Sequence, residues 1–182
     1  MFFEGTNKND DMKICYSELY LDDFTTAMSS VFLVTAQNGY DAFTVLDVFL
    51  SSIVFKEILE RQNPMYLNMG YRQLFECISY DEGFDYKATK GKGVECDPYI
   101  LEWCGWVLSK FFWKYSIDFN DWLKYFSVED VYGYYYPANE ASIDWTADLL
   151  MSNYKYAKER KEFREVTIFN KGLHFGPKSY ED

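Results

Sequence analysis

The sequence predicts an all-α protein, or a mostly α protein with a short β hairpin near the C-terminus, formed by a compact helical domain around two buried apolar helices. Segments 42–60 and 98–115 are apolar over most of a helical circumference, which is typical of helices surrounded by neighbours. The chain has 182 residues, 48% of them hydrophobic, which suits one packed domain. We expect a flexible arm over 1–14, the helical domain over 15–164, and a short strand or extended tail over 165–182.

In the first half of the chain, apolar residues at three- and four-residue steps predict a helix from about Ser17 to Asn38. Gly39 follows as a natural stop. Asp41 can cap the next helix, which we expect to run unbroken over 42–60. A shorter helix is expected over 70–80, before a long loop.

Asp97 followed by Pro98 predicts the start of a helix that ends near Tyr115, because the carboxylate caps and proline suits the first turn. Gly105 lies inside this helix, where glycine costs about 1 kcal/mol relative to alanine. We therefore expect another backbone to approach Gly105 closely. Trp106 belongs to the apolar surface of the helix, and we expect its ring to be buried.

Capping signals predict the remaining helices. Asp118 can cap a short helix over 119–126, and Ser127 with Asp130 has the spacing of a capping box for the next one. A final long helix is expected over 141–164. Apolar residues after it suggest the short strand, hairpin or extended tail.

Composition excludes several classes of function. The formal charge of −11 disfavours a general nucleic-acid binder, which needs a basic footprint, and also a protein that docks on anionic lipid. His174 is the single histidine, so neither a multi-histidine metal site nor a histidine-rich catalytic centre is expected. The four cysteines form no C-x-x-C pair. We expect no enzyme activity, no catalytic residue, no cofactor and no metal.

Targeting signals are also missing from the sequence as given. The N-terminal residues lack a basic and apolar leader, and the longest apolar stretch is too polar to cross a bilayer. We expect a protein of the bacterial host cytoplasm, with no membrane partner.

Three groups of residues are candidate partner-binding surfaces. The first is an acidic set in the glycine- and charge-rich loop over 81–97: Asp81, Glu82, Asp85, Glu95 and Asp97. The second is a tyrosine run that cannot point inward as a whole, and exposed tyrosine is favoured in interfaces: Tyr132, Tyr134 and Tyr135. The third is a basic set near the C-terminus: Lys155, Lys158, Arg160, Lys161 and Arg164. This basic set either covers the acidic body or makes a weak contact with DNA or RNA.

Two segments carry a resemblance to a known group of proteins. One runs from Tyr40 through Ile53 to Tyr66, and the other from Glu102 through Trp113 to Tyr125. Together they resemble a family of small acidic proteins from bacterial mobile elements, some of which are type II-A anti-CRISPR proteins that inhibit Cas9. The similarity covers roughly residues 15–160 and brings no catalytic motif with it.

The resemblance implies that the protein binds a Cas9-type effector, in its guide-RNA-loaded form, and blocks recognition or cleavage of target DNA. Such effectors hold nucleic acid in positively charged channels, where carboxylates can compete with phosphates. The alternative is an antitoxin-like acidic module that neutralises a basic toxin through a protein interface. Both interpretations describe a phage or mobile-element protein that works by protein binding.

Overall fold

A computed structural model describes residues 8–60, 62–161, 166–167 and 174–175, with side-chain surroundings described over 19–60 and 62–161. The helices are α1 (Lys8–Gln37), α2 (Ala42–Ser51), α3 (Ile53–Leu59), α4 (Pro64–Leu67), α5 (Tyr71–Glu82), the 3-10 helix η1 (Tyr86–Thr89), α6 (Pro98–Tyr115), α7 (Phe119–Trp122), α8 (Val128–Gly133), α9 (Tyr135–Ala138) and α10 (Ile143–Arg160). The predicted mostly α class is confirmed.

Two short strands complete the described elements. β1 (Val166–Thr167) and β2 (His174–Phe175) pair antiparallel, with Val166 opposite Phe175. Residues 168–173 between them lie outside the described part of the chain, so the expected hairpin stays a prediction.

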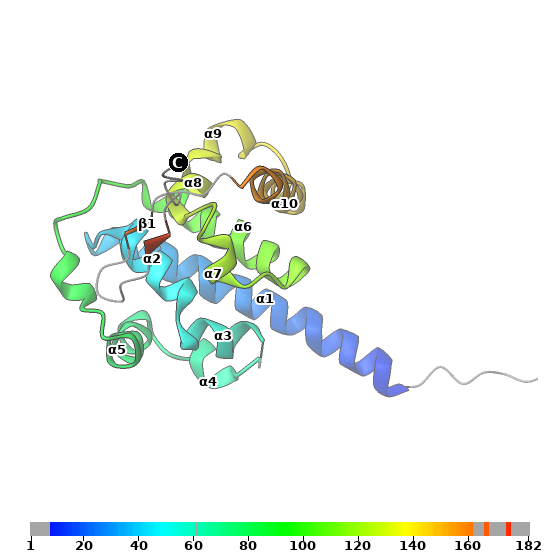
Figure 1. Ribbon diagram of the computed structural model, residues 1–182. Coiled ribbons are helices and arrows are strands. Elements are labelled where there is room, and N and C mark those ends of the chain that lie inside the picture. The colour runs from blue at the N-terminus through cyan, green and yellow to red at the C-terminus, as the bar shows by residue number, and fades with distance from the viewer. Residues whose placement is uncertain (1–7, 61, 162–165, 168–173, 176–182) are drawn as a thin grey trace, which may run out of the picture.

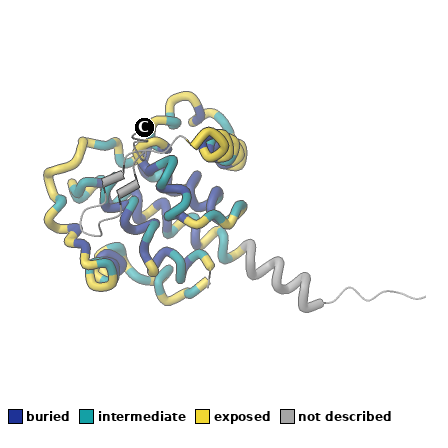
Figure 2. The backbone as a smooth tube through the Cα atoms, in the orientation of Figure 1, coloured by how far each residue is buried: buried dark blue, intermediate teal, exposed yellow. Residues whose placement is uncertain are grey.

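Helices α1 and α6 form the centre of the molecule (Figure 1). The α6 helix packs most extensively along α1 and next along α10, while α2 also contacts α1. We expected segments 42–60 and 98–115 to be the central pair. This was wrong for segment 42–60, because the main neighbour of α6 is α1. Buried residues line the middle of this arrangement, whereas the loop before α6 and the outer side of α10 are exposed (Figure 2).

The approach of α1 to α6 depends on Gly105. A Cβ atom at this position would lie 2.7 Å from the Ser29 Cα and 3.1 Å from the Met28 carbonyl oxygen, both in the backbone of α1. Such distances are shorter than carbon atoms tolerate, so only glycine permits this contact. The predicted close approach is confirmed.

The predicted unbroken helix over 42–60 was wrong, because it is interrupted at Ser52. The backbone there is extended (ψ 159°), and α2 ends as α3 begins. The Ser52 hydroxyl accepts a hydrogen bond from the Phe55 N–H at 3.2 Å and donates to the Phe49 carbonyl at 2.6 Å. Ser52 is fully buried, so its side chain satisfies backbone groups that the break leaves unpaired.

The predicted helix starts are confirmed where a capping residue was named. The carboxylates of Asp41, Asp97 and Asp118 accept backbone N–H groups at the starts of α2, α6 and α7. Ser127 and Asp130 form the reciprocal capping box of α8. These starts depend on hydrogen bonds between residues two or three positions apart, which a sequence displays directly.

The ends of the chain differ from the expected boundaries. α1 begins at Lys8 rather than near Ser17, so residues 8–14, which we assigned to an arm, are helical. The last helix spans Ile143–Arg160, shorter at both ends than expected. Residues 1–7 and 162–165 lie outside the described residues.

Tryptophan burial also needs one correction. Trp106 is 43% exposed, so the expectation that its ring is buried was wrong. It follows Gly105 on α6 and lies roughly 100° around the helix from the side that faces α1. Trp122 occupies the core instead, fully buried and 4.6 Å from the Phe111 ring.

Candidate functional site

The long charged loop before α6 is docked on the body. The Gly91 N–H donates to the Gly39 carbonyl at 2.8 Å, and the Asp41 N–H donates to the Thr89 hydroxyl at 3.2 Å. Gly93 lies so close that a Cβ atom on it would be 2.5 Å from the Asp41 Cα. Residues 89–93 of the loop are therefore held against the start of α2.

The five acidic residues expected to act together are separated along this loop. Asp81 and Glu82 end α5, and Asp85 caps η1. The loop also carries three lysines between Asp85 and Glu95, namely Lys87, Lys90 and Lys92. The acidic set therefore has basic side chains between its two halves, and its role as a partner-binding surface stays a prediction.

Asp97 connects the loop to the tyrosine run. Its N–H donates to the Tyr132 hydroxyl at 3.0 Å, and the Tyr132 ring meets Phe43 edge-on at 5.5 Å. Burial raises the pKa of Tyr132 above its ordinary value. The hydrogen bond from the Asp97 N–H opposes this rise, while the charges of Cys96, Asp97 and Tyr136 add to it.

Two more carboxylates lie beside this contact. Burial raises the pKa of the Cys96 thiol, and the negative charges of Asp41 and Glu129 raise it further. We call Asp41, Asp97 and Glu129 the acidic junction. Each stands at the start of a helix (α2, α6 or α8), where peptide dipoles favour negative charge. The junction gathers carboxylates from segments far apart in the sequence.

The other tyrosines have separate surroundings. The Tyr134 hydroxyl accepts a hydrogen bond from the Asn153 side-chain amide at 2.7 Å, which ties this segment to α10. The Tyr135 ring meets Trp103 edge-on at 5.3 Å, and Tyr136 lies 5.5 Å from Tyr135.

These rings continue onto α6. We call Tyr99, Trp103, Trp106, Tyr135 and Tyr136 the aromatic face. Tyr99, Trp103 and Trp106 follow one another at four- and three-residue steps, so they share one side of the helix. We did not name Tyr99, Trp106 or Tyr136 among the candidate binding residues. The spacing on α6 was the signal that could have found two of them.

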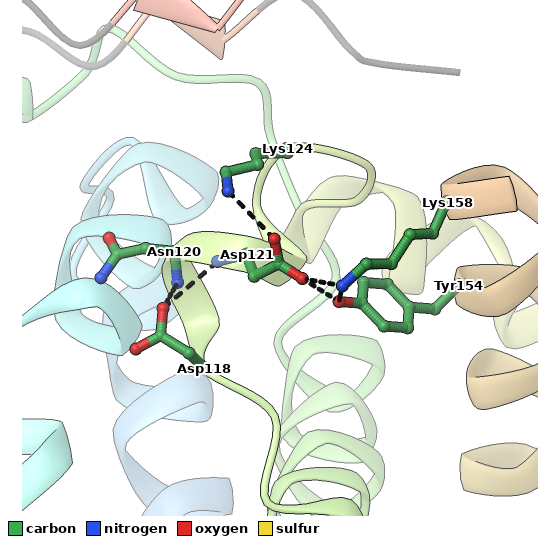
Figure 3. A network of polar contacts seen from close by, with 6 residues as sticks. All are labelled: Asp118, Asn120, Asp121, Lys124, Tyr154 and Lys158. Atoms are coloured by element: carbon green, nitrogen blue, oxygen red, sulfur yellow. Dashed lines mark hydrogen bonds and ion pairs between the residues drawn. The ribbon is translucent and has the colours of Figure 1, made fainter. Parts of the chain in front are cut away.

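Lys158, a member of the basic set near the C-terminus, bonds a distant part of the chain (Figure 3). The Lys158 ammonium donates to the Asp121 carboxylate at 2.6 Å, and Lys124 donates to the other oxygen at 3.0 Å. The Tyr154 hydroxyl donates to the same carboxylate. Asp121 thus joins the chain after α6 to α10.

Interactions within this network shift the pKa values of Asp121 and Tyr154. Burial alone would raise the pKa of Asp121, but hydrogen bonds from Lys158, Tyr154 and Lys124 outweigh burial and hold it below its ordinary value. Burial and the Asp121 carboxylate raise the pKa of Tyr154 to about 12. A lysine engaged in this way is a poor contact for a phosphate.

The rest of the basic set is exposed or outside the described part. The Arg160 guanidinium lies 5.1 Å above the ring of Tyr156, and Lys155 and Lys161 are exposed. Arg164 lies outside the described residues. Lys158 therefore covers part of the acidic body, and the role of the basic set as a whole stays a prediction.

The described residues offer little to a small ligand. Over 19–60 and 62–161, no group of three or more His, Cys, Asp or Glu side chains could hold a metal ion. A hollow of about 370 Å³ lies between η1 and α2, and two of its polar side chains, Thr44 and Asp41, already bond each other at 2.8 Å. Among the described helices, none has the length and apolar character needed to span a membrane.

Comparison with known proteins adds no relative. No family model, no curated protein and no solved structure matches the chain.

Proposed function

We propose that the protein is an inhibitor of a type II-A CRISPR effector, which binds the guide-RNA-loaded Cas9-type protein and blocks recognition or cleavage of target DNA. The observation that carries the proposal is the acidic junction: the Asp97 N–H bonds the Tyr132 hydroxyl at 3.0 Å, and the charges of Asp41 and Glu129 act on the neighbouring Cys96. Carboxylates held on a firm backbone can occupy a basic channel in place of phosphates.

The proposal assigns contact to protein rather than to nucleic acid. The chain carries a net charge of −11, which repels a polyanion. The Lys158 ammonium already pairs with the Asp121 carboxylate at 2.6 Å. Any contact of the basic set with DNA or RNA is secondary on this view.

The direct test is DNA cleavage by a guide-loaded type II-A Cas9, with and without this protein, at two salt concentrations. The informative variant is Glu95→Gln with Glu129→Gln, which removes two exposed charges at or beside the acidic junction without touching a capping aspartate. The control is Asp144→Asn with Glu159→Gln on α10, which changes the net charge equally. Both control residues are exposed.

We expect the junction variant to bind Cas9 more slowly, mainly at low salt, because rim charges act on association rate. The control should bind like the parent. Equal slowing by both variants would assign the effect to net charge and contradict the role of the junction. If no type II-A effector binds the parent, the antitoxin-like module replaces this proposal, with basic toxins as the targets.

A further inference from the structure

The aromatic face combines exposure with continuity. Tyr99 is 73% exposed, Trp106 43% and Tyr136 79%. Trp103 lies between Tyr99 and Trp106 on α6 and is nearly buried under the Tyr135 ring, 5.3 Å away. Trp103 and Tyr135 therefore pack together at the centre of the face, and the exposed rings of Tyr99, Trp106 and Tyr136 lie around them.

Elsewhere the chain places its own cations on exposed or half-exposed rings. The Arg72 guanidinium lies 5.7 Å from the ring of Tyr71, and the Arg160 guanidinium lies 5.1 Å from the ring of Tyr156. Over residues 19–60 and 62–161, no lysine or arginine is placed in this way on the aromatic face. The rings of the face thus carry no stacked cation from the described residues, although Lys110 stands one turn after Trp106 on the same side of α6.

Negative charge adjoins the same rings. Asp97 precedes Tyr99 by two residues, and both Asp97 and Tyr136 lie close enough to Tyr132 to affect its pKa. A partner group suited to this surface must stack on a ring and also reach a carboxylate. Arginine does both, because its planar guanidinium stacks on aromatic faces and donates in pairs to carboxylates, whereas the lysine ammonium is more strongly hydrated.

We propose that the aromatic face, with the adjoining acidic junction, binds arginine side chains on the surface of a basic partner protein. This inference rests on the proposed function in taking the partner to be a basic protein. It deepens that function by naming the residue type that is recognised and the rings that recognise it. An arginine of the partner at the start of α6 would stack on Tyr99 or Tyr136 and pair with Asp97 or Glu129. A second arginine of the partner would stack on Trp106, nine residues after Asp97 along α6.

The test compares two labelled peptides, deca-arginine and deca-lysine, by fluorescence anisotropy with the full chain. The peptides carry equal charge, so a difference between them reports stacking and paired hydrogen bonding. Both cations are attracted to an aromatic ring, but only the guanidinium stacks flat on it and donates in pairs to a carboxylate. We expect the parent to bind deca-arginine at least about fivefold more tightly than deca-lysine.

Two variants of the face keep the result interpretable. Tyr99→Ser with Trp106→Ser removes two exposed rings, and Tyr99→Leu with Trp106→Leu keeps apolar bulk without a ring. Both should lose the preference for arginine. The control, Tyr80→Ser with Trp145→Ser, removes two rings that are 90% and 52% exposed on α5 and α10. It should keep the preference, and circular dichroism should show the same helix content in all four proteins.

An equal affinity of the parent for both peptides overturns the inference, as does an arginine preference that survives both face variants. Inhibition of Cas9 without any arginine preference also overturns it, while leaving the proposed function in place. An arginine preference in a protein that binds no Cas9 supports the face and contradicts the proposed target.

Discussion

Replacing Gly105 by alanine tests the central contact of the fold. Helix propensity alone predicts a gain of about 1 kcal/mol, because glycine is a poor residue inside a helix. The structure predicts the opposite sign. The new methyl group would lie 2.7 Å from the Ser29 Cα and 3.0 Å from the Ser29 N, where carbon atoms prefer about 3.5–4.0 Å.

The magnitude follows from what must move. The obstructing atoms belong to the backbone of α1, so no side-chain rotation relieves the clash, and the helices must separate by roughly 1 Å. Overpacking of this kind costs about 1–3 kcal/mol, and we take the upper end because the α1–α6 contact is the largest in the molecule. Subtracting the propensity gain leaves a net loss of about 2 kcal/mol.

Urea unfolding followed by circular dichroism measures this change. In a chain of this size the melting temperature should also fall by about 4–8 °C. The matched control is Gly133→Ala at the end of α8, where nothing lies within 4 Å of the added methyl group. The control should keep or gain stability, by up to about 1 kcal/mol. A Gly105→Ala protein as stable as the parent would refute the close approach of α1 and α6.

Three further predictions concern burial, the helix break and pH. Trp106→Ala should cost less than about 1 kcal/mol, while Trp122→Ala should cost about 3–5 kcal/mol in the same urea assay. Ser52→Ala should cost about 1–2 kcal/mol, because a buried cap and its backbone partners lose their hydrogen bonds. The free energy of unfolding should fall as pH rises from 10 to 12, because the fold raises the pKa of Tyr154 to about 12. The Tyr154→Phe variant should lose less stability over this pH range.

Each of these has an opposing result. A large loss in Trp106→Ala would place that ring in the core after all. A neutral or stabilising Ser52→Ala would mean that α2 and α3 form one continuous helix. For the pH prediction, melting temperatures of Tyr154→Phe that fall as steeply as those of the parent above pH 10 would show that this hydroxyl does not carry the linkage.

The sequence predicts those parts of the fold that depend on interactions between residues close together in the chain. The starts of α6 and α8 depend on Asp97, Pro98 and the Ser127–Asp130 pair, whose partners are a few residues away. Gly105 is predictable for another reason, since an unfavourable residue inside a helix needs a packing explanation. The break at Ser52 is different. A serine can cap a helix or sit within one, and its burial among distant residues decides between these states.

The candidate site was predicted only in parts. The Tyr132 and Asp97 positions were named, but their contact joins residues 35 positions apart, which no local pattern reveals. Likewise, the basic set looked like one surface, whereas Lys158 turns to Asp121, 37 positions earlier. Charge and ring content can be counted in a sequence; the choice of partner for each charged group depends on long-range packing.

The packing of α6 decides which of its sides is left as the candidate surface. Gly105 directs one side of this helix against α1, and Phe111 reaches Trp122 beneath α10 on another side. The side with Tyr99, Trp103 and Trp106 is left over, and α9 covers only its centre through Tyr135. If the helices separate in Gly105→Ala, α6 can rotate and this third side shifts with it. Loss of stability and loss of arginine preference should therefore occur together in that variant, whereas the ring variants should lose only the preference.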